Sequence, residues 1–159
     1  MAIQIGDSIP QATLKVMGEK GPEDLSTAEL FANGKVVLFA VPGAFTPTCS
    51  AAHLPGYVVH ADDIKAKGVD KIVCMAVNDA FVMDAWGKAH NAENLIMAAD
   101  GNCEFSEALG LTMDGSGFGL GKRSQRFALV AENGKLTHLA LEEGGALEKS
   151  AAEAILAVL

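Results

Sequence analysis

One cysteine in this sequence lies where a helix start can make a thiol reactive. Cys49 ends the octapeptide 42–49 (PGAFTPTC), which directly follows the apolar run 36–41. An apolar run and then a Pro/Gly turn predict a buried strand, a tight connection and a helix that begins at the cysteine. Unpaired amides at a helix N-terminus stabilise negative charge, so the nucleophilic thiolate is favoured there. The octapeptide therefore predicts a cysteine nucleophile.

Three further residues have the chemistry to assist this thiol. Thr46 lies one helical turn before Cys49, so its hydroxyl can reach the sulfur and a bound oxygen together. Pro42 closes one side of the site and removes a competing backbone donor. Arg126, at the start of a later apolar run, can supply a cation, because arginine stays charged and offers a rigid donor fork. These four are the candidate catalytic residues.

The other two cysteines have different settings. Cys74 lies in the middle of an apolar run, which is typical of a buried structural thiol. Cys103 follows a Gly-Asn pair near a predicted helix start, and both an exposed thiol without a role and a secondary reactive thiol remain open for it. The chain has no CxxC motif and no Cys/His pair at zinc-site spacing. We therefore expect a reducing compartment and no metal centre.

The elements that position these residues follow from apolar periodicity and turn signals. Extended segments are predicted at 3–5, 12–16, 35–41, 71–77, 95–98, 126–132 and 135–141, and helices at 26–31, 50–67, 80–90, 103–109 and 150–159. Residues 26–29 and 150–153 match the capping box, 133–134 is an Asn-Gly hairpin signal, and 55–56 (Pro-Gly) predicts a two-part helix. This order predicts one α/β domain, 1–159, with a thioredoxin-like central mixed sheet flanked by helices and extra N-terminal strands.

Composition excludes several classes of partner. Half of the residues are hydrophobic, but no apolar run approaches the roughly 18 residues that cross a bilayer. The net charge of −8 and the lack of a basic run argue against nucleic acid. The N-terminus has no secretory signal pattern. We expect a cytoplasmic protein, or an organellar one whose transit peptide has been removed.

The spacing Pro42-x-x-x-Thr46-x-x-Cys49 resembles the peroxiredoxin active-site signature, and PGAFTPTCS resembles the subfamily called peroxiredoxin five or type II. The resemblance continues in order through 53–57 (HLPGY), 77–82 (VNDAFV), 86–87 (WG) and 123–128 (RSQRFA). It implies a thioredoxin-like fold with Cys49 as the peroxidatic cysteine, Thr46 and Pro42 as its pocket partners, and Arg126 as the activating arginine. It also implies a protein without metal or organic prosthetic group, commonly a homodimer.

The implied reaction is peroxide reduction, in the service of antioxidant defence and cell redox homeostasis. The Cys49 thiolate attacks one oxygen of hydrogen peroxide or a small alkyl hydroperoxide, which leaves water or an alcohol and a sulfenic acid. Some relatives carry a resolving cysteine near the C-terminus, but 141–159 contains none and Ser150 occupies that neighbourhood. Plant-type relatives carry a cysteine resembling Cys74 and often use glutaredoxin or glutathione. We therefore expect an external thiol, from glutaredoxin with glutathione or from thioredoxin.

The same residues allow two other functions. Cys49 could relay a redox signal without turnover, or could pair with His53 as a cysteine hydrolase. We expect His53 to lie one turn up the helix, away from the thiol pocket, as a packing or surface residue. The glycine-rich run 115–121 lacks GxGxxG spacing and a preceding strand, so it is expected to be a mobile loop that leads toward Arg126. The remaining histidines have no ligand spacing: His60, His90 and His138.

Overall fold

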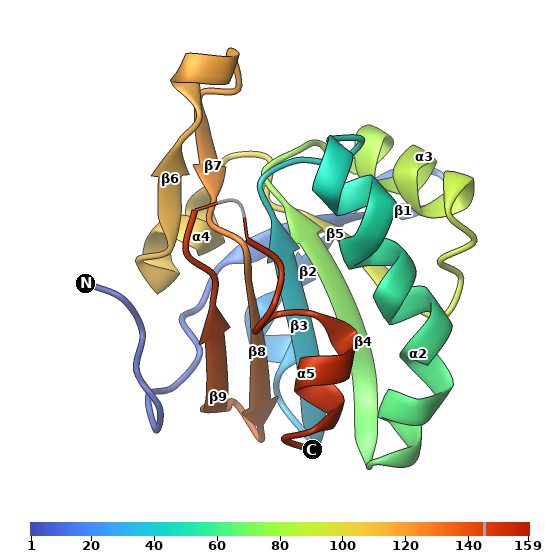
Figure 1. The fold of residues 1–159 in the computed structure, drawn as a ribbon, viewed down its shortest axis with the longest axis vertical. Coiled ribbons are helices and arrows are strands. Elements are labelled where there is room, and N and C mark those ends of the chain that lie inside the picture. The colour runs from blue at the N-terminus through green and yellow to red at the C-terminus, as the bar shows by residue number, and fades with distance from the viewer. Residues whose placement is uncertain (145) are drawn as a thin grey trace.

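The computed structural model describes residues 1–144 and 146–159, and within them a seven-stranded mixed sheet carries helices on both faces (Figure 1). The sheet has the order β2-β1-β5-β4-β3-β8-β9. Its strands are β1 (Thr13–Gly18), β2 (Gly21–Ser26), β3 (Lys35–Val41), β4 (Val69–Ala76), β5 (Ile96–Ala99), β8 (Phe127–Glu132) and β9 (Lys135–Leu141). The α-helices are α1 (Thr27–Leu30), α2 (Leu54–Ala66), α3 (Ala80–Ala89), α4 (Glu104–Leu109) and α5 (Ala152–Leu156). The predicted thioredoxin-like α/β architecture is confirmed.

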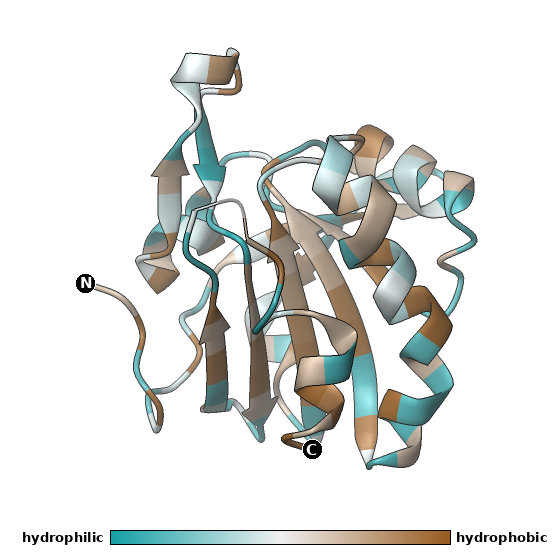
Figure 2. Ribbon diagram, viewed as in Figure 1, coloured by the Kyte–Doolittle hydropathy of each residue, from teal (hydrophilic) through white to brown (hydrophobic). Residues whose placement is uncertain are grey.

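The central strand β3 separates two apolar cores. It runs parallel to β4 and antiparallel to β8, with Phe39 opposite Cys74 on one side and Ala128 on the other. Successive side chains of a strand face opposite sides of the sheet, and β3 is apolar at every position from 36 to 41. Val37, Phe39 and Val41 join the core under α2, α3 and α5, while Val36, Leu38 and Ala40 join the core with α1 and α4. Figure 2 shows the resulting hydrophobic centre of the sheet.

Several local signals fold as the sequence predicts. The side chain of Ser26 accepts a hydrogen bond from the amide of Glu29 and caps α1. Asn133 and Gly134 both have left-handed backbones, with φ of 50° and 82°, as a two-residue type I′ hairpin loop requires. The helix after Cys49 has two parts, a π-helical segment η1 (Cys49–His53) and then α2, which carries Pro55 in its first turn. Proline removes one N–H from the hydrogen-bond ladder of this continuous helix, and the π-helical turn before it is a known way to accommodate such an irregularity.

The second predicted capping box is wrong. Ala151, not Ser150, is the N-cap of α5, and no side chain caps the helix. The hydroxyl of Ser150 donates instead to the carboxylate of Glu142, 2.6 Å away. The helix also ends at Leu156 rather than at the C-terminus. The hydrogen bond to Glu142 therefore replaces the capping bond that the local sequence pattern predicts for Ser150.

Three other segments differ from the secondary structure that the sequence predicts. Residues 3–5 form no strand; the amide of Ile3 bonds to the carbonyl of Leu109 and ties the N-terminal segment to α4. Strand β2 was not predicted because its sequence, GPEDLS, has no apolar alternation. A second small sheet pairs β6 (Thr112–Asp114) with β7 (Lys122–Ser124), and the glycine-rich run forms the tip of this projecting hairpin with the 3₁₀ turn η2 (Ser116–Phe118) (Figure 1).

Across the described residues, every helix is too short or too polar to span a lipid bilayer.

Candidate active site

The candidate nucleophile lies in the first turn of the helix that follows β3. Helical conformation begins at Pro47, and the amide of Ser50 donates to the carbonyl of Thr46 at 2.9 Å. Cys49 is 1% exposed. The strand, the turn and the helix start therefore occur in the predicted order, and they place the thiol at the edge of the core that α2, α3 and α5 cover.

The turn before Cys49 is held in a strained shape. Phe45 has φ of 62°, a left-handed conformation that costs an aromatic residue about 1–2 kcal/mol. Two hydrogen bonds maintain it. The side-chain oxygen of Asn78 accepts from the amide of Ala44 at 3.0 Å, and the hydroxyl of Thr46 donates to the carbonyl of Gly43 at 2.6 Å. The hydrogen of Thr46 is thus committed to the turn, while its oxygen can still accept a hydrogen bond.

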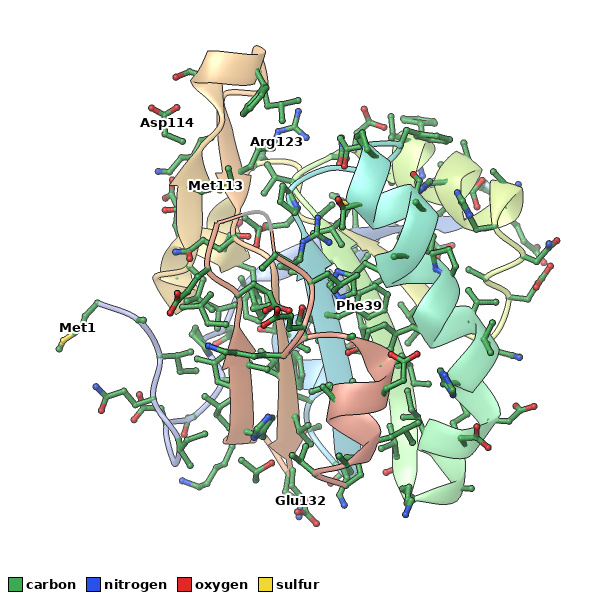
Figure 3. All side chains as sticks on the ribbon, in the orientation of Figure 1. Met1, Phe39, Met113, Asp114, Arg123 and Glu132 are labelled. Carbon is green, nitrogen blue, oxygen red and sulfur yellow. The ribbon has the colours of Figure 1, made fainter. Side chains whose placement is uncertain are left out.

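A second arginine ties the projecting hairpin to this turn. Arg123, on β7, donates from Nε to the carbonyl of Leu120 at 2.9 Å and from Nη1 to the carbonyl of Pro42 at 3.4 Å. A Cβ at position 43 would lie 3.2 Å from Nη1 of Arg123, so Gly43 permits this approach. Figure 3 shows the Arg123 side chain between the hairpin and the helices that cover the sheet.

Arg126 meets the thiol directly. Its Nη2 donates to Sγ of Cys49 at 3.1 Å and its Nη1 donates to Nδ1 of His53 at 2.7 Å. The side chain is buried, and its Nε is a buried donor without a partner in the described part of the chain. A buried guanidinium needs hydrogen-bond acceptors, and the sulfur of Cys49 is one of them. The predicted juxtaposition of Arg126 and Cys49 is therefore present.

His53 lies inside the site, and the prediction that it sits away from the thiol is wrong. The guanidinium of Arg126 is wide enough to contact both side chains of the helical turn at once. Nε2 of His53 lies 3.0 Å from the carbonyl of Ser150, and the ring packs on Phe39 with centroids 4.9 Å apart. Burial and the charge of Arg126 lower the pKa of His53 to about 4, so the ring is neutral at pH 7.

This arrangement removes the basis for a Cys–His hydrolase. A carbonyl only accepts hydrogen bonds, so the bond to Ser150 places the proton of His53 on Nε2. Nδ1 then accepts from Arg126. Both ring nitrogens are engaged, and neither is free to take the proton of Cys49.

Among the described residues, neither of the other two thiols accepts a hydrogen bond from a cation, and the charge of Lys122 only partly offsets the raised pKa of Cys103. Cys74 is 0% exposed in β4, and burial, then the charge at Cys49, raises its pKa well above the usual value. Cys103 has φ of 60° at the N-cap of α4, and burial, then the charge of Asp100, raises its pKa. All three cysteines are free and buried. Among the described residues, no three His, Cys, Asp or Glu side chains gather as a metal site would require.

Sequence reasoning missed the residues that support the site rather than face the thiol. These are Asn78, Arg123, Glu142, Ser150 and Tyr57. Asn78 precedes Asp79, the N-cap of α3, and its side chain bonds instead to the turn before Cys49. Tyr57 and Arg123 lie in segments that resemble peroxiredoxins, but their contacts join residues more than 80 positions apart, which local patterns do not predict. The contact between Glu142 and Ser150 crosses the connection between β9 and α5 and likewise has no local pattern.

Comparison with known proteins identifies the family of the chain. The family model described as Redoxin matches residues 4–156, so the chain belongs to the redoxin family. It is 49% identical to "Peroxiredoxin-2E-2, chloroplastic" of Oryza sativa subsp. japonica over 99% of this chain and 72% of the relative, and 45% identical to "Peroxiredoxin-2D" of Arabidopsis thaliana over 99% and 98%. Within the redoxins, the chain is a peroxiredoxin of the type II or peroxiredoxin five group, a thiol peroxidase.

Solved structures give the same result. The structure described as reduced Prx3 in complex with H2O2 from Vibrio vulnificus has a TM-score of 0.95 and 56% identity, with 98% of each chain covered. The structure of peroxiredoxin 5 from Alvinella pompejana has a TM-score of 0.85 and 33% identity, with 98% and 96% covered. The expected family and enzyme class are thus confirmed.

Proposed function

We propose that Cys49 is the peroxidatic nucleophile of a peroxidase for hydrogen peroxide and small alkyl hydroperoxides. The observation that carries the proposal is the 3.1 Å contact between Nη2 of Arg126 and Sγ of Cys49. The guanidinium stabilises the thiolate that must attack. Thr46 and Pro42 shape the turn over the sulfur, and the oxygen of Thr46 can accept the peroxide hydrogen.

The chemical step follows from these groups. An S–O bond forms between Cys49 and one peroxide oxygen while the O–O bond breaks, and the sulfur is oxidised to a sulfenic acid. The departing oxygen takes the bonding pair and, from solvent, the equivalent of the proton that Cys49 gave up on ionising, and it leaves as water or an alcohol. Charge builds on this oxygen in the transition state, where preorganised donors lower the barrier most. The unpartnered Nε of Arg126 is such a donor.

The second thiol comes from outside the chain in this proposal. Cys74 is enclosed in the sheet, and Cys103 occupies the N-cap position of α4 on the opposite face without a capping hydrogen bond from its side chain. The raised pKa of each makes it a poor attacking thiol. The segment 141–159 contains no cysteine. We favour glutaredoxin with glutathione as the donor over thioredoxin, on the likeness to plant type II peroxiredoxins.

The finer setting of the enzyme is part of the same proposal. We take 1–159 as one peroxidase domain that works in the cytoplasm and forms a homodimer. Exposed aromatic side chains support self-association: Phe45 is 56%, Phe81 64% and Phe118 87% exposed. Sedimentation of the purified protein tests the dimer, and a monomer at micromolar concentration would contradict it.

Peroxide consumption by the purified protein tests the function. Turnover is expected with glutathione plus glutaredoxin, and Cys74→Ser and Cys103→Ser should retain it, with Cys49→Ser as the inactive control. Oxidation of one equivalent without turnover under any donor would favour a redox sensor instead. Loss of turnover in a folded Cys74→Ser or Cys103→Ser variant would contradict the external thiol.

A further inference from the structure

The carboxylate of Glu142 organises the segment between β9 and α5. It is 5% exposed, and its Oε2 accepts hydrogen bonds from the amides of Glu148 and Ser150, both at 2.8 Å, and from the hydroxyl of Ser150 at 2.6 Å. Its Oε1 accepts from the amide of Lys149 at 3.2 Å. Burial raises the pKa of Glu142, but these hydrogen bonds outweigh it and the net shift is downward. The side chain is therefore ionised at pH 7 and held entirely by N–H and O–H groups.

The backbone of Glu142 also contacts the strand start that carries the catalytic cation. Its amide donates to the carbonyl of Arg126 at 3.0 Å. Glu142 thus holds the backbone of Arg126 with its main chain and residues 148–150 with its side chain. It is an acidic side chain buried beside a site that contains a buried cation, yet no salt bridge joins the two among the described residues.

The clamped segment presents one acceptor to the active site. Because the amide and hydroxyl of Ser150 bond to Glu142, the position of its carbonyl is fixed. That carbonyl accepts from Nε2 of His53 at 3.0 Å and from the hydroxyl of Tyr57 at 2.7 Å. The acceptor therefore dictates which nitrogen of His53 carries the proton.

The tautomer of His53 decides how Arg126 is held. With the proton on Nε2, Nδ1 has a lone pair and accepts from Nη1 of Arg126 at 2.7 Å. With the proton on Nδ1, two donors would face each other and the guanidinium would have to move. Arg126 donates to Cys49 from its other terminal nitrogen, so any rotation displaces the donor from the sulfur.

We propose that Glu142 is a positioning residue of the peroxidase site: through Ser150 it fixes the tautomer of His53, which in turn aims Arg126 at Cys49. The inference rests on the proposed role of Cys49. Glu142 does not contact the substrate in this proposal. It fixes a chain of hydrogen bonds through Ser150 and His53, and the last residue of that chain, Arg126, faces the reacting sulfur. The reacting group is thereby coupled to residues that lie near the other end of the sequence.

The test compares Glu142→Ala with Glu142→Gln. Alanine removes all four acceptor contacts, whereas glutamine can keep its oxygen at the Oε2 position and lose only the bond from Lys149. We expect single-turnover oxidation of Cys49 by hydrogen peroxide, measured without reductant, to slow by about 10- to 100-fold in Glu142→Ala, with partial rescue by glutamine. The matched control is Glu153→Ala, an exposed acid on α5 outside the chain of contacts.

The nitrogen-15 resonances of His53 give a readout that a purely structural role would not move. The wild-type ring should show a protonated Nε2 and an unprotonated Nδ1, and folded Glu142→Ala should lose this pattern. In a His53→Gln background, Glu142→Ala should have little further effect on the rate. Wild-type rate and tautomer in folded Glu142→Ala, or full additivity with His53→Gln, would overturn the inference. If wild-type Cys49 itself is not oxidised by peroxide, the proposed function fails instead.

Discussion

Cys49 and Cys74 belong to the same apolar core, and both are almost completely shielded from solvent. Cys74 has only apolar strand neighbours, and burial raises its pKa well above the usual value. Cys49 is equally buried, but its Sγ lies 3.1 Å from Nη2 of Arg126, and the residue stands in the first turn of a helix. The comparison teaches that two equally buried thiols differ in what surrounds them: apolar strand residues shield Cys74, whereas a cationic donor meets the sulfur of Cys49.

The largest expected effect comes from removing the thiol that has the cation. Cys49→Ser should abolish peroxide turnover, because a serine hydroxyl does not ionise near neutral pH and cannot accept an oxygen as sulfur does. The measurement is steady-state peroxide consumption with glutathione and glutaredoxin. Residual turnover at more than background would show that a second cysteine carries the reaction.

Removing the cation should make Cys49 resemble Cys74. Arg126→Ala is expected to slow sulfenic acid formation by about 100- to 1,000-fold, since it removes donors to both the thiolate and the leaving oxygen. The ultraviolet absorbance of the thiolate at pH 7 should fall in parallel. Arg126→Lys is the matched variant: it keeps the charge but loses the fork, and its rate should lie between the two. An unchanged rate in folded Arg126→Ala would remove Arg126 from the mechanism.

Low pH is expected to reduce the free energy of unfolding through His53, the residue that holds Arg126 beside Cys49. The folded pKa of His53 is about 4, below its ordinary 6.5, so the unfolded chain binds the extra proton first as pH falls. Stability is then lost between about pH 6.5 and 4 by about 3 kcal/mol, and this loss does not grow below pH 4. The lowered pKa of Glu142 adds a further loss of stability that begins as pH falls below about 4.5 and continues until its folded carboxylate is protonated.

Chemical denaturation at a series of pH values measures this dependence. His53→Gln should flatten the slope between pH 6.5 and 4, because the ionising group is gone. His60→Gln provides the control, since His60 lies on α2 beside exposed acids rather than in the core. An equal slope in wild type and His53→Gln would contradict the assignment of the buried neutral ring.

The smallest effect is expected at the thiol without a cation. Cys74→Ala should leave the rate of Cys49 oxidation unchanged and lower stability by about 1–2 kcal/mol through the cavity it leaves in the core. Cys74→Ser should cost more stability because a buried hydroxyl needs a partner. Thermal unfolding and single-turnover kinetics on the same samples separate the two effects. A slower reaction in stable Cys74→Ala would mean that Cys74 contributes to the chemistry.

The fold was predictable wherever local sequence decides the structure. The two Ser-x-x-Glu patterns show the limit. Ser26 caps its helix because nothing else competes for its hydroxyl, whereas Ser150 has the same pattern and is taken by Glu142. The N-cap of α5 would contribute about 1 kcal/mol to stability. The hydroxyl of Ser150 bonds instead to the buried carboxylate of Glu142, which accepts four hydrogen bonds in all and has more to lose if one is left unmade.

The candidate site divides in the same way. Cys49 and the turn before it could be predicted because a strand, a Pro/Gly turn and a helix start are local patterns. Arg126 could be anticipated from the need for a cation, but its contact with His53 depends on how far the guanidinium reaches across the helical turn. The roles of Glu142 and Asn78 required the folded structure, since each acts on a segment that is distant in sequence or belongs to a different element.

Trp86 has one consequence for observing this protein. It is the only tryptophan in the sequence, it is 0% exposed, and its Nε1 donates to the hydroxyl of Ser50 at 3.0 Å. Ser50 is the residue next to the nucleophile, so a change in the helical turn at Cys49 alters the hydrogen bond of the indole. The fluorescence of an unlabelled sample should therefore follow the oxidation of a single sulfur atom in real time.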